Sequence, residues 1–108
     1  MTTPNLSSLT PTDKIRLAAE LDDYYYGTGQ NDSEECWRKS NGNYAVEIPD
    51  YLTSYDAIIP LIQKQNNMGG LYAVMSEYLN RIQINWWYDA TPSQLLDALL
   101  LATGKATI

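Results

Sequence analysis

Carboxylates are the side chains whose type and spacing come closest to a site for chemistry in this sequence. They gather before and within the first polar stretch, at Asp22, Asp23, Asp32, Glu34 and Glu35. Such a group could bind a divalent cation or supply a general acid and a general base. The spacing lacks the Asp-x-Asp-x-Asp-Gly run of a calcium loop. The pattern therefore names neither a metal nor a reaction.

Histidine, on which most other catalytic and metal sites depend, is absent from the chain, and Cys36 is the single cysteine. This excludes Ser-His-Asp and Cys-His arrangements, and one thiolate cannot build a zinc cage. No glycine-rich phosphate loop is present, because Gly69-Gly70 stands alone. We therefore expect no enzymatic activity, no metal and no cofactor.

Aromatic residues are the second unusual feature, since the chain has nine tyrosines and three tryptophans but no phenylalanine. Tyr and Trp suit positions with one wet end and are enriched at interfaces, although they also fill half-buried positions. Three successive tyrosines cannot all face one core from a helix, and neighbours on a strand point to opposite faces. One of Trp86 and Trp87 should therefore be core, and the other should be covered by a helix or a partner. The candidate interface residues are Tyr24, Tyr25, Tyr26, Trp37, Trp86, Trp87 and Tyr88.

Length and charge limit the class of protein. A chain of 108 residues predicts one domain, here over residues 10–108, preceded by a disordered tail over 1–9. The net charge of −6 argues against direct nucleic-acid binding and permits a basic partner. We expect no membrane span and no signal peptide, because the chain lacks a long apolar run and its first residues lack a basic and an apolar region. The cytosol is the expected location.

Two helices carry complete start signals. Ala90–Lys105 has a capping Thr91, a proline at the first helical position, apolar residues at helical spacing and Gly104 at its end. The first helix starts at Pro11 behind Thr10, with an acidic residue three positions after the cap. We expect it to include Tyr24 and Tyr25 and to end at Gly27 and Gly29, although Asp22 and Asp23 oppose its dipole.

The middle of the chain alternates between polar and apolar stretches. We first expect a loop over Thr28–Asn43 with a short helix at its centre, capped by Asn31, Asp32 or Ser33, and then a strand over Tyr44–Ile48. A helix follows from Thr53 or Ser54 to Asn66, and it is either kinked at Pro60 or regular only from there. The last two elements are a helix over Leu71–Ile82, favoured over a short initial strand, and a strand over Gln83–Tyr88. These elements predict an α+β fold of three to four helices and two to three strands.

The residues that leave the first strand have a structural interpretation. Pro49 stops the ladder, Tyr51 can pack before the cap, and Asp50 or Thr53 can bind the free amides of the next helix. We prefer this interpretation to a ligand site. The predicted helix-start motif comprises Pro49, Asp50, Tyr51, Thr53, Thr91 and Pro92.

Two segments, IPDYLTSYDAIIPLIQK and ATPSQLLDALLLATGK, together resemble the phage ABA-sandwich domain family of small bacteriophage and prophage proteins. The resemblance rests on Pro49, Asp50, Tyr51, Thr91, Gln94 and Ala98. It implies a small sheet sandwiched between helices and no defined activity, so no functional residue is carried over. The chain departs from the pattern at Pro60, in the polar loop over 28–43, and in the consecutive leucines 99–101.

The resemblance and the aromatic surplus favour a non-catalytic phage accessory protein in the host cytoplasm. It would bind a host or phage protein, for instance as an inhibitor of a host enzyme or defence system. A second hypothesis is a small-molecule or nucleotide-signal sponge, whose phosphate contacts would come from Arg16, Arg38, Lys39 or Arg81. A structural phage protein is a third hypothesis, and an enzyme that uses carboxylates and tyrosines is a fourth. The leucine run further predicts a homo-oligomer.

Overall fold

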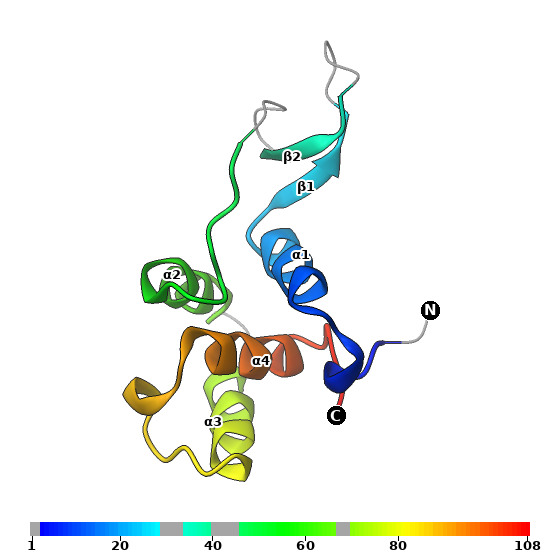
Figure 1. The fold of residues 1–108 in the computed structure, drawn as a ribbon. Helices are drawn as coiled ribbons and strands as arrows, with labels where there is room; N and C mark the ends of the chain where they lie inside the picture. Colours follow the sequence, from blue (N-terminus) through cyan, green and yellow to red (C-terminus); the bar gives the residue numbers. More distant parts are fainter. Residues whose placement is uncertain (1–2, 29–33, 40–45, 67–69) are drawn as a thin grey trace.

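Three helices cover a fourth, leucine-rich helix, and a β-hairpin extends from them (Figure 1). The computed structural model describes residues 3–28, 34–39, 46–66 and 70–108. Their elements are α1 Pro11–Leu21, β1 Tyr24–Gly27, β2 Cys36–Lys39, α2 Tyr55–Gln65, α3 Leu71–Arg81 and α4 Pro92–Ala102, with 3-10 turns η1 Leu6–Ser8 and η2 Trp87–Asp89. The predicted α+β class and the numbers of helices and strands are confirmed. The sheet packs against α1 and lies at one end of the helices (Figure 1).

Helix α4 is the centre of the core. Leu95, Leu96, Leu99 and Leu100 are at most 1% exposed, because α1, α2 and α3 all contact this helix. A helix that is apolar on all sides is stable only when other elements cover it all round. The chain itself covers these four leucines and half-buries Leu101, so the leucine run gives no argument for self-association.

Both predicted capping signals are confirmed. The hydroxyl of Thr10 accepts a hydrogen bond from the N–H of Asp13, whose carboxylate accepts one from the N–H of Thr10. Thr91 and Gln94 exchange the same two hydrogen bonds at the start of α4. This reciprocal arrangement satisfies two free donors at each helix start. The first of these threonines also holds the pKa of Asp13 below its usual value through the same hydrogen bonds.

The first helix ends at Leu21, earlier than the sequence predicts. Asp22 is its C-cap, and Asp23 adopts a left-handed φ of 66°. Aspartate tolerates this conformation, and its charge disfavours further turns at the negative end of a helix. The prediction that Tyr24 and Tyr25 continue the helix to Gly27 and Gly29 is therefore wrong.

The tyrosines instead form strand β1, which pairs antiparallel with β2 so that Tyr26 opposes Trp37 and Tyr25 opposes Arg38. The predicted short helix over this second segment is wrong in its described part, since Cys36–Lys39 is a strand. Aromatic residues favour a pleated surface, and the opposed rings of Tyr26 and Trp37 meet edge to face at 5.5 Å. The proposed caps Asn31, Asp32 and Ser33 lie outside the described residues.

Both other predicted strands fail in the described part of the chain. Residues 46–48 form no strand and make one backbone bond to β2, from Val46 N–H to Trp37 C=O at 3.0 Å, while Tyr44 and Ala45 lie outside the described residues. Gln83 has a left-handed φ of 67°, and Ile84 N–H donates to Leu79 C=O at 2.8 Å. These features end α3 in a turn, and the predicted strand over Gln83–Tyr88 is replaced by this turn and η2.

Helices α2 and α3 match their predictions. Helix α2 begins after Ser54 and continues through Pro60 to Gln65, so the alternative in which only its second half is regular is wrong. Helix α3 is helical from Leu71 onward, which excludes the initial strand. In the described part of the chain, no helix has both the length and the apolar character needed to cross a bilayer.

The residues before α2 form a local hydrogen-bonded turn rather than the predicted cap of that helix by Asp50 or Thr53. Asp50 accepts the N–H of Leu52 at 3.2 Å and the hydroxyl of Thr53, and the latter bond is the main reason that the pKa of Asp50 is lowered. Pro49 is half-buried, and Tyr51 is fully buried. The N-cap itself is Ser54, whose side chain makes no capping bond.

A polar network ties the end of α1 to α2. The hydroxyl of Tyr51 donates to Asp22 at 2.7 Å, and Lys64 Nζ lies 3.1 Å from Asp22 and 2.8 Å from Asp23. Burial, followed by the neighbouring Asp22 carboxylate, raises the pKa of Tyr51. These two carboxylates, which the sequence offered for a reaction, are thus engaged in holding the hairpin base to α2.

The N-terminal segment contacts the C-terminus. Residues 3–9, which the sequence assigns to a tail, contain η1, and Leu6 N–H donates to Thr107 C=O at 2.6 Å. Asn5 and Thr107 form an isolated parallel bridge. The two ends of the described chain therefore lie side by side (Figure 1).

Replacement of Thr91 by Ala should lower the free energy of unfolding by about 1 kcal/mol, because the start of the core helix loses its cap. Urea unfolding followed by circular dichroism measures this. The matched control is Ser54→Ala, which removes no capping bond and should cost less than about 0.5 kcal/mol. Equal losses in the two variants would contradict the assigned role of Thr91.

Tyr51→Phe should destabilise the protein by about 1 kcal/mol at neutral pH through loss of the bond to Asp22. The raised pKa of folded Tyr51 means that its stabilisation is complete below the unfolded pKa of about 10 and is lost as pH rises through the folded value. Wild-type stability should therefore fall in alkali, and the fall should be shallower in the variant. Tyr78, whose pKa burial also raises, leaves a residual slope. Urea unfolding at a series of alkaline pH values tests this, and identical slopes would contradict it.

Candidate functional site

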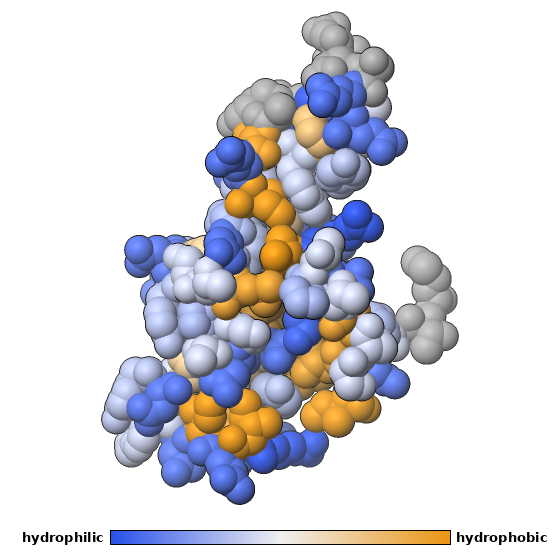
Figure 2. Space-filling view, in the orientation of Figure 1, coloured by the Kyte–Doolittle hydropathy of each residue, from blue (hydrophilic) through white to orange (hydrophobic). Residues whose placement is uncertain are grey.

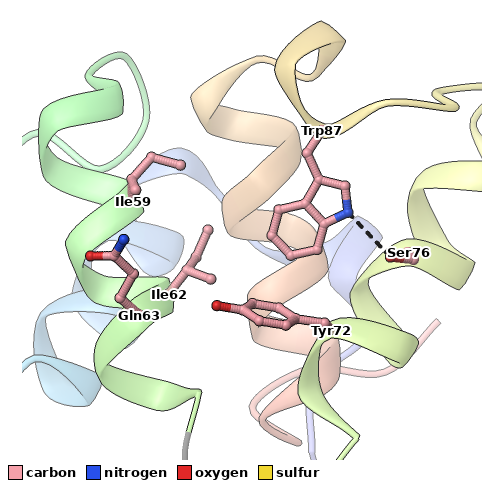
Figure 3. Close-up of a pocket in the computed structure, with 6 residues that line it drawn as sticks. All are labelled: Ile59, Ile62, Gln63, Tyr72, Ser76 and Trp87. Atoms are coloured by element: carbon pink, nitrogen blue, oxygen red, sulfur yellow. Dashed lines mark hydrogen bonds between the residues drawn. The ribbon is translucent and has the colours of Figure 1, made fainter.

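A groove lies between α2 and α3 and is closed at one end by the turn η2 (Figure 3). Its volume is about 380 Å³, and its surface is mainly apolar. The lining side chains are Ile59, Ile62, Gln63, Tyr72, Ser76 and Trp87. Figure 3 shows the indole of Trp87 and the ring of Tyr72 facing the side chains of α2 across the groove.

Trp87 is held in place by two contacts with α3. Its indole N–H donates to the hydroxyl of Ser76 at 3.1 Å, and its ring meets that of Tyr72 edge to face at 5.1 Å. These contacts satisfy the polar atom of the indole and leave its apolar body as a wall of the groove. A third link comes from Tyr55 at the start of α2, whose hydroxyl donates to Ala90 C=O just after the turn. The groove is therefore bounded by elements that are bonded to one another.

Two further rings of the same turn project into solvent. Trp86 is 61% exposed and Tyr88 is 77% exposed, and their rings lie nearly parallel with centroids 6.0 Å apart. Large aromatic side chains at such exposure beside an apolar groove are typical of binding surfaces. Trp87 contacts the core while Trp86 faces outward, but a 3-10 turn rather than a strand produces this division.

The candidate interface residues predicted from the sequence fall into two groups. Trp87 lines the groove, and Trp86 and Tyr88 are its neighbours in the chain. The other four belong to the hairpin, which extends from the far side of the helices (Figure 1). In the hairpin, Lys39 lies over the ring of Tyr24 at 5.1 Å and Arg16 over that of Tyr26 at 5.9 Å. These two hairpin rings thus already have cations as partners.

The groove also contains residues that the sequence analysis did not single out. In the sequence, Ile59 and Ile62 are apolar positions of the helix predicted to end at Asn66, and no role is predicted for Tyr72. Tyr72 could have been noticed, because it falls outside the apolar stripe of α3 and is 41% exposed. The isoleucines carry no such signal, since an apolar helix position looks the same whether it meets a core or a groove.

Of the five predicted carboxylates, the four that the structure describes do not assemble into a reactive site. Asp22 and Asp23 are engaged with Lys64 and Tyr51, Glu34 and Glu35 are exposed, and Asp32 lies outside the described residues. Among the residues that the structure describes, no three His, Cys, Asp or Glu side chains are close enough to hold a metal ion.

A second concave region of about 460 Å³ lies where α1, α3, α4 and the two chain ends meet. It contains two of the basic side chains, but Lys14 is 2.9 Å from Asp97 and Arg81 is 3.1 Å from Glu77. An anionic ligand would have to compete with these carboxylates. Figure 2 shows hydrophobic surface where α3 and the C-terminus lie, and Ile82 and Ile108 are exposed there.

Comparison of the chain with protein-family models, with curated proteins and with solved structures gave no match. The resemblance to the phage ABA-sandwich family therefore stays a prediction, and the site is argued from its geometry alone.

Iodide should quench mainly the fluorescence of Trp86, because the ion is excluded from packed indoles and this ring is the exposed one. Replacement of Trp86 by Phe should therefore remove most of the quenchable emission. Trp87→Phe should leave it in place, since the indole of Trp87 is half-buried between α3 and the groove. A loss of quenching in the second variant rather than the first would contradict the arrangement of this turn.

Proposed function

We propose that the protein is a non-catalytic accessory protein that acts by binding another protein through the aromatic groove. The surface comprises the groove between α2 and α3 together with Trp86 and Tyr88, and we call it the aromatic face. The observation that carries the proposal is the exposure of these two rings beside an apolar hollow. Exposed Trp and Tyr side chains around such a hollow resemble the hot spots of protein interfaces, where a few aromatic anchors supply most of the binding energy.

The construction of the aromatic face supports a binding role. Its walls are held by the bonds from Trp87 to Ser76 and from Tyr55 to Ala90, so the groove is formed before a partner arrives. A pre-formed surface loses little conformational freedom on association, which favours affinity. The amide of Gln63 also lines the groove, and it can both donate and accept hydrogen bonds from a bound segment.

The biological setting of this proposal comes from the sequence resemblance. A small acidic phage protein in the host cytoplasm that binds a host or phage protein, such as a host enzyme or defence factor, fits the aromatic face and the absence of histidine from the chain. A nucleotide sponge is favoured less, because the concave region with basic side chains has them in ion pairs. A structural phage role would need a partner surface as well, and the aromatic face would supply it.

Photo-crosslinking tests the proposal directly. A photoreactive amino acid placed at position 86 should capture a specific protein in the host cell, whereas the same residue at position 26, on the hairpin, should not capture that protein. Both positions are exposed aromatic residues, so the label differs only in place. The captured protein should also lose co-purification with the Trp86→Ala, Tyr88→Ala double variant. Equal capture from both positions, or no capture at 86, would contradict binding through the aromatic face.

A further inference from the structure

We infer that the segment bound by the aromatic face is cationic, with a lysine or arginine next to a large apolar side chain. This inference deepens the proposed function and rests on it. It comes from the distribution of charge around the groove, which differs from that of the rest of the chain.

Two of the chain stretches around the groove contain acidic residues and no basic ones, and the basic residues at their borders, Lys64 and Arg81, lie in ion pairs. Residues 46–63 and 82–96, which supply most of α2, the aromatic turn and the start of α4, include neither Lys nor Arg. Their acidic residues are Glu47, Asp50, Asp56 and Asp89. A groove bordered by one sign of charge attracts a partner of the opposite sign and repels a like-charged one.

Two of these carboxylates flank the aromatic face. Asp89 belongs to η2 and follows Tyr88 directly. Asp56 lies in the first turn of α2, three residues before the groove residue Ile59, and residues at this spacing share a helix face. The bond from Tyr55 to Ala90 brings the two segments together at one end of the groove. In the described part of the chain, neither carboxylate lies in an ion pair.

Most cations of the chain are committed elsewhere. Lys64 and Arg81 pair with carboxylates, and Lys14 of α1 pairs with Asp97 of α4. Arg16 and Lys39 lie over tyrosine rings of the hairpin.

The two remaining cations also lie away from the aromatic turn. Arg38 is 2% exposed and donates to the carbonyl oxygens of Gly27 and Glu34 at 2.9 Å each, within the hairpin. Lys105 follows the C-terminal end of α4, whereas the aromatic turn precedes the start of that helix. In a chain with a net charge of −6, the acidic residues near Trp86 and Tyr88 therefore have no free Lys or Arg beside them in residues 82–96.

The exposed rings themselves favour a cation. The face of an indole or phenol ring attracts an ammonium or guanidinium group, and a nearby carboxylate adds to this attraction. The groove beside the rings, walled by Ile59, Ile62 and Trp87, accepts an apolar side chain. A segment with both features would place its cation over Trp86 or Tyr88, near Asp89, and its apolar residue in the groove. A purely apolar segment would leave the carboxylates unused, and an acidic one would be repelled.

Selection from a displayed random peptide library against the purified protein tests the inference. The enriched peptides should carry Lys or Arg next to Leu, Ile, Met or an aromatic residue. Their affinities, measured with synthetic peptides by calorimetry, should fall about tenfold or more in the Trp86→Ala, Tyr88→Ala variant. They should fall about threefold in the Asp56→Asn, Asp89→Asn variant at low salt, and this second loss should shrink at about 0.5 M salt. Circular dichroism should show both variants folded, because all four residues are exposed.

Matched controls are Tyr26→Ala for the rings and Glu20→Gln for the charges, which lie on the hairpin and on α1 and should leave the affinities unchanged. Enrichment of acidic or purely apolar peptides, no enrichment, or equal binding by the Asp56→Asn, Asp89→Asn variant would overturn the cationic segment. So would a dimer, detected by light scattering, that the Trp86→Ala, Tyr88→Ala variant dissociates, because a second copy would then occupy the face. If position 86 still captures a host protein while the peptides fail, the proposed function stands and this inference alone falls.

Discussion

The structure depends on covering helix α4 on all sides. Leucines occupy most sides of this helix, and burial of each leucine side chain contributes roughly 1.5–3 kcal/mol to stability relative to exposure. Helices α1, α2 and α3 each contact α4, which explains why the described core gathers around one short helix. The chain ends close this arrangement, since Leu6 and Leu9 also pack against the core.

The aromatic face is a consequence of that arrangement. Because α2 and α3 both pack towards α4, their outer edges form the walls of a groove rather than a filled seam. The turn that leads into α4 lies at the end of this groove, and Trp87 closes it through Ser76. The capped start of α4 follows this turn after Ala90, which is buried, while the rings of Trp86 and Tyr88 are exposed.

Basic side chains are distributed unequally between the hairpin and the aromatic face. Lys64 holds the base of the hairpin, and Arg16 and Lys39 contact its tyrosines. Tyr24 and Tyr26 of the hairpin thus have cations as partners, whereas Trp86 and Tyr88 are exposed, and the one charged residue within 82–96 is the acidic Asp89. Two aromatic clusters that look alike in the sequence therefore have different surroundings, and for this reason we propose the aromatic face rather than the hairpin as the binding surface.

The sequence by itself determined the four helices, because caps such as Thr10 and Thr91 and the apolar periodicity of Leu71–Arg81 act within a few residues of each other. From residue type it also predicted that one of Trp86 and Trp87 belongs to the core, and Trp87 does pack against it. The interface role of Trp86, Trp87 and Tyr88 stays a prediction. Only the tertiary structure decided that Tyr24–Gly27 pairs with Cys36–Lys39, and that Gln83–Tyr88 does not form a strand. Strand pairing requires a partner distant in the chain, and β-forming residues occur in both segments. The groove likewise needs α2 and α3 side by side, which no local pattern of Ile59, Ile62 or Tyr72 could indicate.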